Sequence, residues 1–167
     1  MIIRKAKLND VPGIMQVIHN IVPLMRADGN YQWDSTYPNP QVFEQDIAAG
    51  QLWVADVDGV IAGAAAITTE QYPEYADVGL DISQPAIVVH RLAVDTKFRG
   101  MGIAAALLMQ AEQESVNRGF NLLRIDTNSQ NKAAQSLFPK LGYVFAGEMG
   151  LKFRPGMRFY CYEKRLD

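Results

Sequence analysis

A turn with two glycines and an arginine carries the clearest chemistry in this sequence. It reads Arg99-Gly100-Met101-Gly102-Ile103-Ala104 and lies between a β-branched run that ends at Val94 and an apolar-striped helix. Glycine lets backbone approach an anion closely, and the first turn of a helix has unpaired N–H groups that bind phosphate. Arg99 can add a charge-assisted hydrogen bond. The turn therefore predicts a pyrophosphate site; the alternative is a strand-to-helix turn that uses glycine for geometry alone.

Two common phosphate motifs do not fit this turn. No Lys-Ser or Lys-Thr pair follows the glycines, as a P-loop requires. Ala105 stands where the dinucleotide fingerprint G-x-G-x-x-G has its third glycine. Asp126 lies near the place of the acidic residue that binds ribose in that fingerprint. A nucleotide- or dinucleotide-binding domain is therefore kept as a weaker hypothesis.

The elements that must position the turn alternate between strands and helices. Strands are expected over 2–6, 52–56, 60–68, 87–94, 122–127, 143–148 and 157–165, and helices over 11–21, 41–49, from near 102 to the stop signal at Gly119, and 131–141. The segments 23–40 and 70–85 show no periodicity and are expected as irregular connections. A βαβ crossover followed by an antiparallel pair predicts an α/β fold. We expect a single domain over residues 1–167, with a mixed, twisted sheet of about six to seven strands and helices on both faces.

Composition limits the class of protein. The 167 residues are 49% hydrophobic with a formal net charge of −2, which favours a folded domain and argues against a nucleic-acid-binding surface. Cys161 is the single cysteine, so an intramolecular disulfide is excluded, and with two distant histidines it predicts no metal site. Neither a signal peptide nor an apolar run long enough to span a bilayer is evident, so we expect a cytoplasmic protein without a membrane partner.

Two segments together indicate a family. The turn resembles motif A of the GNAT superfamily of N-acetyltransferases, R/Q-x-x-G-x-G/A, and the flanking Arg91-Leu92-Ala93-Val94-Asp95 and Leu107-Leu108 are similar to that family too. The segment 131–143, which starts at Asn131 and ends in Leu141-Gly142-Tyr143, resembles motif B, N-x-x-A-x-x-L-Y-x-x-x-G-F/Y, at the expected distance. The resemblance implies the alternating fold described above. It also implies an acyl-CoA-dependent N-acyltransferase in which a primary amine attacks acetyl-CoA directly.

The same resemblance implies which residues bind the co-substrate. Acetyl-CoA would lie where two parallel strands, ending at Val94 and Thr127, diverge. The expected ligands are Leu92, Ala93 and Val94 for the thioester carbonyl and pantetheine arm, and Arg99, Gly100, Met101, Gly102, Ile103 and Ala104 for the pyrophosphate. Asn131 would bind the pantetheine from the start of its helix, or else cap that helix in the ordinary way.

His90 is the candidate general base. An alkyl ammonium must lose a proton before it can attack a thioester, so a base or a water chain is useful at neutral pH. His90 shares the parity of Leu92 and Val94, which places it on their face of the strand unless a bulge intervenes. The alternative is a half-buried histidine that makes one local hydrogen bond.

Phe138 departs from the family pattern. Many members have a tyrosine there that protonates the departing thiolate, and phenylalanine cannot donate a proton. Three outcomes follow: water or another hydroxyl serves instead, the enzyme is slow, or catalysis is lost. The last would make the chain an acyl-CoA-binding module without significant turnover.

The sequence does not identify the acceptor amine. Trp33, Tyr37 and Tyr160 are candidate substrate-binding residues, because aromatic and polar side chains gather in residues 31–37 and in the final hairpin. The connection 70–81 is a third region that could line the acceptor pocket. Aromatic residues that fix an irregular loop to the sheet are the alternative. A small-molecule amine or a peptide amine fits equally well, and a homodimer, common in the family, is left open.

Overall fold

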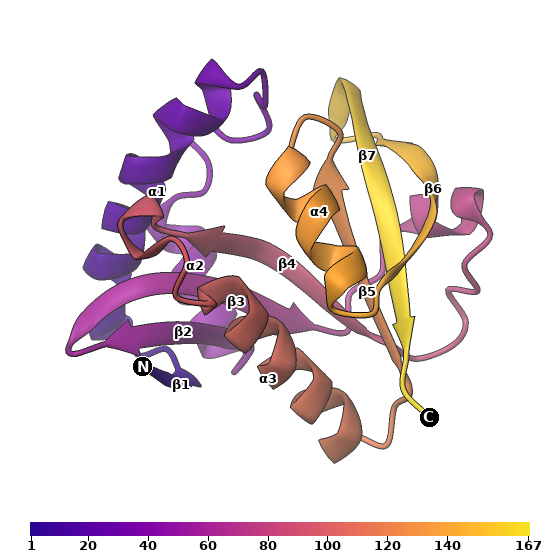
Figure 1. The fold of residues 1–167 in the computed structure, drawn as a ribbon, viewed down its shortest axis with the longest axis horizontal. Helices are drawn as coiled ribbons and strands as arrows, with labels where there is room; N and C mark the ends of the chain where they lie inside the picture. The colour runs from indigo at the N-terminus through magenta and orange to yellow at the C-terminus, as the bar shows by residue number, and fades with distance from the viewer.

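The computed structural model describes residues 1–167 and centres on one twisted sheet of seven strands (Figure 1). The strands are β1 Ile2–Lys5, β2 Leu52–Val57, β3 Val60–Thr68, β4 Ile87–Val94, β5 Leu122–Asn128, β6 Val144–Leu151 and β7 Arg154–Arg165. Their order across the sheet is β1-β2-β3-β4-β5-β7-β6. Only β4 and β5 pair in parallel, and every other neighbouring pair is antiparallel. The predicted mixed sheet is confirmed.

Helices cover both faces of this sheet, also as predicted. They are α1 Val11–Ala27, α2 Pro40–Ala48, α3 Ile103–Asn117 and α4 Lys132–Lys140, with short 3-10 helices η1 Leu8–Asp10, η2 Pro73–Val78 and η3 Thr96–Phe98. One face, here called the α3 side, packs against α3 and α4 through a cluster that includes Ile87, Leu107 and Phe138. The other face, the α1 side, packs against α1, α2 and η2. No helix combines the length and apolarity needed to cross a bilayer.

The first helix is longer than its sequence pattern predicts. The irregular segment was expected from Pro23, but α1 continues through that proline to Ala27. Proline lacks an N–H, so the carbonyl of His19 loses its helical partner. Both residues lie on the exposed side of α1, where water can bond the freed carbonyl, while Ile21 and Val22 remain buried. The free energy gained by burying the apolar face of α1 thus exceeds the cost of one lost hydrogen bond.

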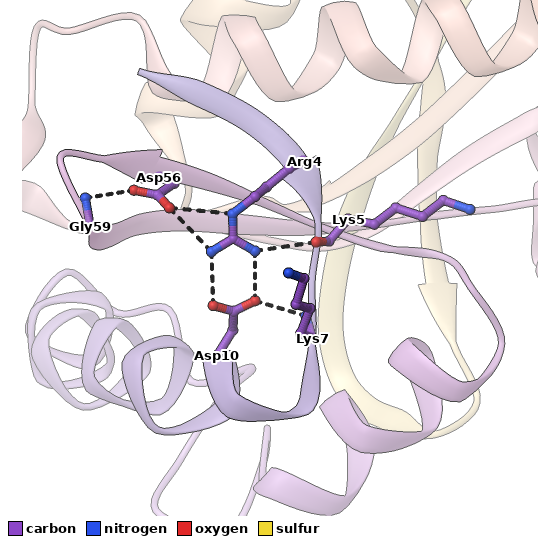
Figure 2. Close-up of polar contacts among 6 residues, drawn as sticks. All are labelled: Arg4, Lys5, Lys7, Asp10, Asp56 and Gly59. Atoms are coloured by element: carbon purple, nitrogen blue, oxygen red, sulfur yellow. Dashed lines mark hydrogen bonds and ion pairs between the residues drawn. The ribbon is translucent and has the colours of Figure 1, made fainter.

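Arg4 ties the first strand to the start of α1 and to the β2–β3 hairpin (Figure 2). Its guanidinium donates to both carboxylate oxygens of Asp10, at 2.8 and 2.9 Å, and to Asp56 at 3.2 and 3.3 Å. Asp10 also accepts the N–H of Lys7, and Asp56 accepts the N–H of Gly59. The Arg4 guanidinium lowers the pKa of Asp10 below its ordinary value. The network fixes one edge of the sheet.

Candidate active site

The parallel strands β4 and β5 diverge soon after they meet. They pair only through Ile87–Leu123, Val88–Arg124 and Val89–Ile125. Figure 1 shows β4 turning toward α1 while β5 runs beside β7. A cavity of about 1030 Å³ opens at this divergence. It lies at the two strands from which the sequence analysis expected acetyl-CoA binding, and its size suits a large organic ligand.

A β-bulge interrupts β4 at the edge of the cavity. Arg91 and Leu92 together stand opposite Ala65 of β3. Arg91 has a φ of +53°, in the left-handed region that non-glycine residues rarely adopt. The carboxylate of Asp46 in α2 accepts hydrogen bonds from Arg91 Nε and Nη2, both at 2.7 Å. This bidentate ion pair holds the bulged residue from outside the strand.

The bulge changes which face His90 occupies. His90 pairs with Ala66, which belongs to the cluster beneath α1, whereas Leu92 and Val94 pack against the cluster beneath α3. The parity argument, which put His90 on the face of Leu92 and Val94, is therefore wrong, because one extra residue shifts the alternation of a strand. His90 approaches the cavity from the α1 side.

The turn before α3 has the geometry of an anion site. Gly100 and Gly102 have φ values of +83° and +73°, and no atom lies within 4 Å of a Cβ built on either residue. Positive φ, and not crowding, therefore requires glycine here. The N–H groups of the four residues 102–105 donate to no protein acceptor, and all four residues line the cavity. Such unpaired donors at a helix start suit a phosphate group.

Most of the residues predicted to bind the co-substrate line the cavity. These are Leu92, Ala93, Val94, Arg99, Gly100, Gly102, Ile103, Ala104 and Asn131. Met101 is 49% exposed and does not line it. Asn131 Oδ1 accepts the N–H of Ala134 at 3.1 Å, so this side chain does cap α4. Its amide nitrogen donates to no protein group, which leaves that donor free for a ligand.

His90 is held in a defined orientation. Its side chain is buried, with 6% of the residue exposed, and Nε2 lies 2.8 Å from the backbone oxygen of Glu70. A carbonyl oxygen only accepts, so Nε2 carries the hydrogen and Nδ1 is the acceptor of the neutral ring. The ring of Tyr72 packs against His90 with centroids 4.8 Å apart. His90 can therefore take up a proton at Nδ1.

Asp126 adds a carboxylate on the α1 side of the cavity. The hydroxyl of Tyr75 donates to its Oδ1 at 2.6 Å. Burial raises the pKa of Asp126, against the opposing effects of the Tyr75 hydrogen bond and of nearby His90. From the sequence, Asp126 was expected only as a ribose ligand of a dinucleotide-binding domain. Its partner Tyr75, fully buried in η2, lies in a segment without periodicity, so no sequence signal joined the two.

The aromatic candidates for acceptor binding divide into two groups. Trp33 and Tyr37 line the cavity. Tyr160 does not: its ring packs edge-on against Phe145, with centroids 5.5 Å apart, and contacts the cluster of the α3 side. Tyr72 lines the cavity too; it lies in the connection 70–81, which the sequence offered as a pocket lining without singling out this residue.

Phe138 forms part of the cavity wall where it meets the core. It is 2% exposed, with ring centroids 5.9 Å from Tyr143 and 5.3 Å from Tyr162. The cavity is also lined by residues that carry hydroxyl groups, namely Tyr37, Tyr72, Thr96 and Thr127. Burial raises the pKa of Tyr72, so its hydroxyl remains protonated at neutral pH.

Sequence comparison places the chain in a family. The model of the acetyltransferase (GNAT) family matches residues 18–143, and the protein belongs to this family. It is 26% identical to the uncharacterized N-acetyltransferase YesJ of Bacillus subtilis over 147 residues, 85% of this chain and 81% of YesJ. It is 27% identical to N-acetylaspartate synthetase of Homo sapiens over 113 residues, 68% of this chain. The matched part is only 34% of that synthetase, so the chain spans about a third of its length.

Solved structures agree with the family assignment. A GNAT-family acetyltransferase from Streptococcus agalactiae is 28% identical, with a TM-score of 0.79 over 99% of this chain and 95% of that one. The protein yncA of Salmonella typhimurium, solved with its cofactor acetyl-CoA, has a TM-score of 0.73 at 20% identity over 100% of this chain and 94% of that one. At that identity the likeness concerns the fold. Both the predicted α/β fold and the predicted superfamily are confirmed.

Proposed function

We propose that this protein transfers the acetyl group of acetyl-CoA to a primary amine. The observation that carries the proposal is the cavity between β4 and β5, which has unpaired backbone donors on its α3 side and His90 on its α1 side. Membership of the GNAT family supports it, as do relatives whose names describe N-acetyltransferases.

The α3 side fits the co-substrate. The free N–H groups of residues 102–105 and the guanidinium of Arg99 suit a pyrophosphate. Beyond Val89 the backbone of β4 no longer pairs with β5, so its polar groups can bond the amides of the pantetheine arm. Acetyl-CoA supplies the activated thioester, whose carbonyl carbon is the electrophile.

The α1 side fits the proton transfers. His90 Nδ1 takes a proton from the attacking amine while Nε2 stays bonded to the Glu70 carbonyl. The amine nitrogen then bonds to the carbonyl carbon and loses a second proton to solvent as the C–S bond breaks, and the departing thiolate needs a proton that Phe138 cannot give. A hydroxyl of the cavity wall, with Tyr72 as the best placed beside His90, or water supplies this proton.

The first experiment is isothermal titration of the purified chain with acetyl-CoA, with ATP and NAD as controls. We expect selective micromolar binding of acetyl-CoA. Preference for ATP or NAD would overturn the proposal and favour the nucleotide-binding hypothesis.

A second candidate function rests on Phe138. If thiolate protonation fails, the chain binds acyl-CoA without useful turnover. Release of free CoA thiol in the presence of a panel of amines separates the two functions, because only the enzyme releases thiol steadily and in step with acetylated amine.

A further inference from the structure

Arg154 is a cation without an acidic partner on the α1 side of the cavity. It is the first residue of β7, at the hairpin that joins β6 to β7 (Figure 1), and it lines the cavity. No ion pair involves it. Arg91, the other arginine on this side, is already neutralised by Asp46. The charge of Arg154 is therefore free to meet an anionic ligand.

Aromatic rings hold the Arg154 guanidinium in place. Its central carbon lies 5.1 Å from the ring centroid of Tyr37 and 5.4 Å from that of Phe153. Nη1 donates to the backbone oxygen of Phe153 at 3.0 Å, whereas Nε is buried and has no partner. A buried donor without an acceptor costs free energy unless a ligand supplies the acceptor. A guanidinium fixed by stacking also loses little freedom on binding.

A continuous wall of rings joins Arg154 to the reacting end of the cavity. Phe153 packs against Tyr72 with centroids 5.2 Å apart, and Tyr72 packs against His90 at 4.8 Å. Asp126 lines the cavity on the same side as His90. The α1 side thus has a cation at one end and a base with a carboxylate at the other. The pyrophosphate turn begins α3 on the opposite face, so Arg154 is not placed to serve it.

We propose that the acceptor is an amine that also carries a carboxylate. Its carboxylate lies on the Arg154 guanidinium, and its amine lies at His90 and Asp126. This inference rests on the proposed function and names its substrate class. The planar fork of a guanidinium matches the two oxygens of a carboxylate, and the Asp126 carboxylate attracts an ammonium before it is deprotonated. A simple alkylamine would leave the Arg154 guanidinium without an anionic partner, and a diamine would bring a second cation beside it.

The test compares matched acceptors. Purified wild-type protein is assayed for CoA thiol release with amino acids in which one to six carbons separate the amine from the carboxylate, and with the carboxamide of each, which keeps the amine and the size but removes the negative charge. For the amino acid that is acetylated best, we expect kcat/KM on the order of 10²-fold above that of its carboxamide. Equal or better use of the carboxamide would overturn the inference. Preference for O-phosphoethanolamine over every carboxylate would overturn it too, and would assign a phosphate to Arg154.

Three variants separate a role in recognition from a role in folding. Arg154→Gln should lower kcat/KM on the order of 10²-fold for the amino acid, leave the carboxamide nearly unchanged, and leave the KM for acetyl-CoA unchanged. Arg154→Lys should restore part of the loss, because it keeps the charge without the fork. Arg158→Gln, on the same strand but paired with the exposed Glu148, should change nothing. An equal loss for both acceptors in Arg154→Gln would indicate a structural role and overturn the inference.

Binding without turnover distinguishes this inference from the proposed activity. The same amino acids are titrated into wild type and Arg154→Gln, each saturated with CoA. Binding to wild type that is lost in the variant, with no acetylation, would support the carboxylate site and contradict the acetyltransferase. Acetylation of amines without a carboxylate, with no binding of amino acids, would leave the acetyltransferase standing and overturn the carboxylate site.

Discussion

The two sides of the cavity are built in different ways. On the α3 side the polar groups are mainly backbone N–H donors from one short segment, residues 102–105, at the start of α3. On the α1 side they are side chains from five separate segments, Tyr37, Tyr72, His90, Asp126 and Arg154. A site made of local backbone depends on conformation, and glycine at two positions is enough to specify it. A site made of distant side chains depends on how the whole chain packs.

This contrast separates the general part of the reaction from the specific part. The α3 side suits a co-substrate that every member of such a family can share, because backbone donors do not change when side chains do. Under the proposed function the α1 side would select the acceptor, because each of its groups is a side chain that can be exchanged alone. Changes on the two sides should therefore affect different measured constants.

The largest effect is expected from Gly102→Glu. The new carboxylate would stand at the pyrophosphate, and we expect the Kd for acetyl-CoA to rise at least about 10²-fold, measured by titration calorimetry. Gly119→Glu is the matched control: it lies just beyond the other end of α3, has a φ of +72°, and has no atom within 4 Å of its Cβ position. It carries the same strain and charge but should keep the affinity. Retained affinity in Gly102→Glu would refute the anion site.

His90→Gln should act on the other side of the cavity. The amide can still donate to the Glu70 carbonyl, so the fold is expected to persist. We expect kcat to fall on the order of 10²-fold, with the Kd for acetyl-CoA unchanged. A base must be unprotonated, so wild-type turnover rises with pH along an acidic limb that the variant should lack. The same limb in both proteins would make His90 structural.

Phe138→Tyr tests the missing proton donor at the boundary of the two sides. The side chain is buried against the Tyr143 and Tyr162 rings, and it also lines the cavity. We expect kcat to rise up to about tenfold. This is less than a positioned general acid usually contributes, because another group already protonates the thiolate in the wild type. The melting temperature should stay within a few degrees of the wild-type value, which corresponds to a change in the free energy of unfolding of less than about 1 kcal/mol. An unchanged kcat would mean that thiolate protonation does not limit the rate.

The smallest effect on ligand binding is expected from Asp10→Asn, because Asp10 does not line the cavity. The variant should lose about 1–2 kcal/mol of stability at pH 7 but bind acetyl-CoA normally. The pKa of Asp10 is lower when folded than when unfolded, so its contribution is present above the unfolded value, about 3.9, and is lost as pH falls through the folded one. Denaturation curves of wild type and variant should therefore converge in acid. A constant difference would show that the ionised carboxylate is not the stabilising group.

Sequence patterns predicted the sheet, its helices and the turn before α3, because each depends on neighbours in the chain. The continuous apolar run of β3, the apolar stripe of α3 and the positive φ of Gly100 and Gly102 are local properties. The same reasoning failed for Tyr160, whose side of β7 depends on the pairing with β5 and β6. The proline pattern also predicted an end of α1 before Pro23, but burial of Ile21 and Val22 keeps the chain helical to Ala27.

By itself, the sequence determined the order of elements, the family and the glycine turn before α3, since periodicity, glycine and helix starts act over a few residues. The tertiary structure alone decided which side chains line the α1 side of the cavity. Asp46 supports the bulge at Arg91 from 45 positions away, and that bulge moves His90 to the α1 side. Tyr75 reaches Asp126 across 51 positions. Contacts between distant segments offset the entropic cost of bringing those segments together only in the packed chain. No local sequence pattern therefore predicts them.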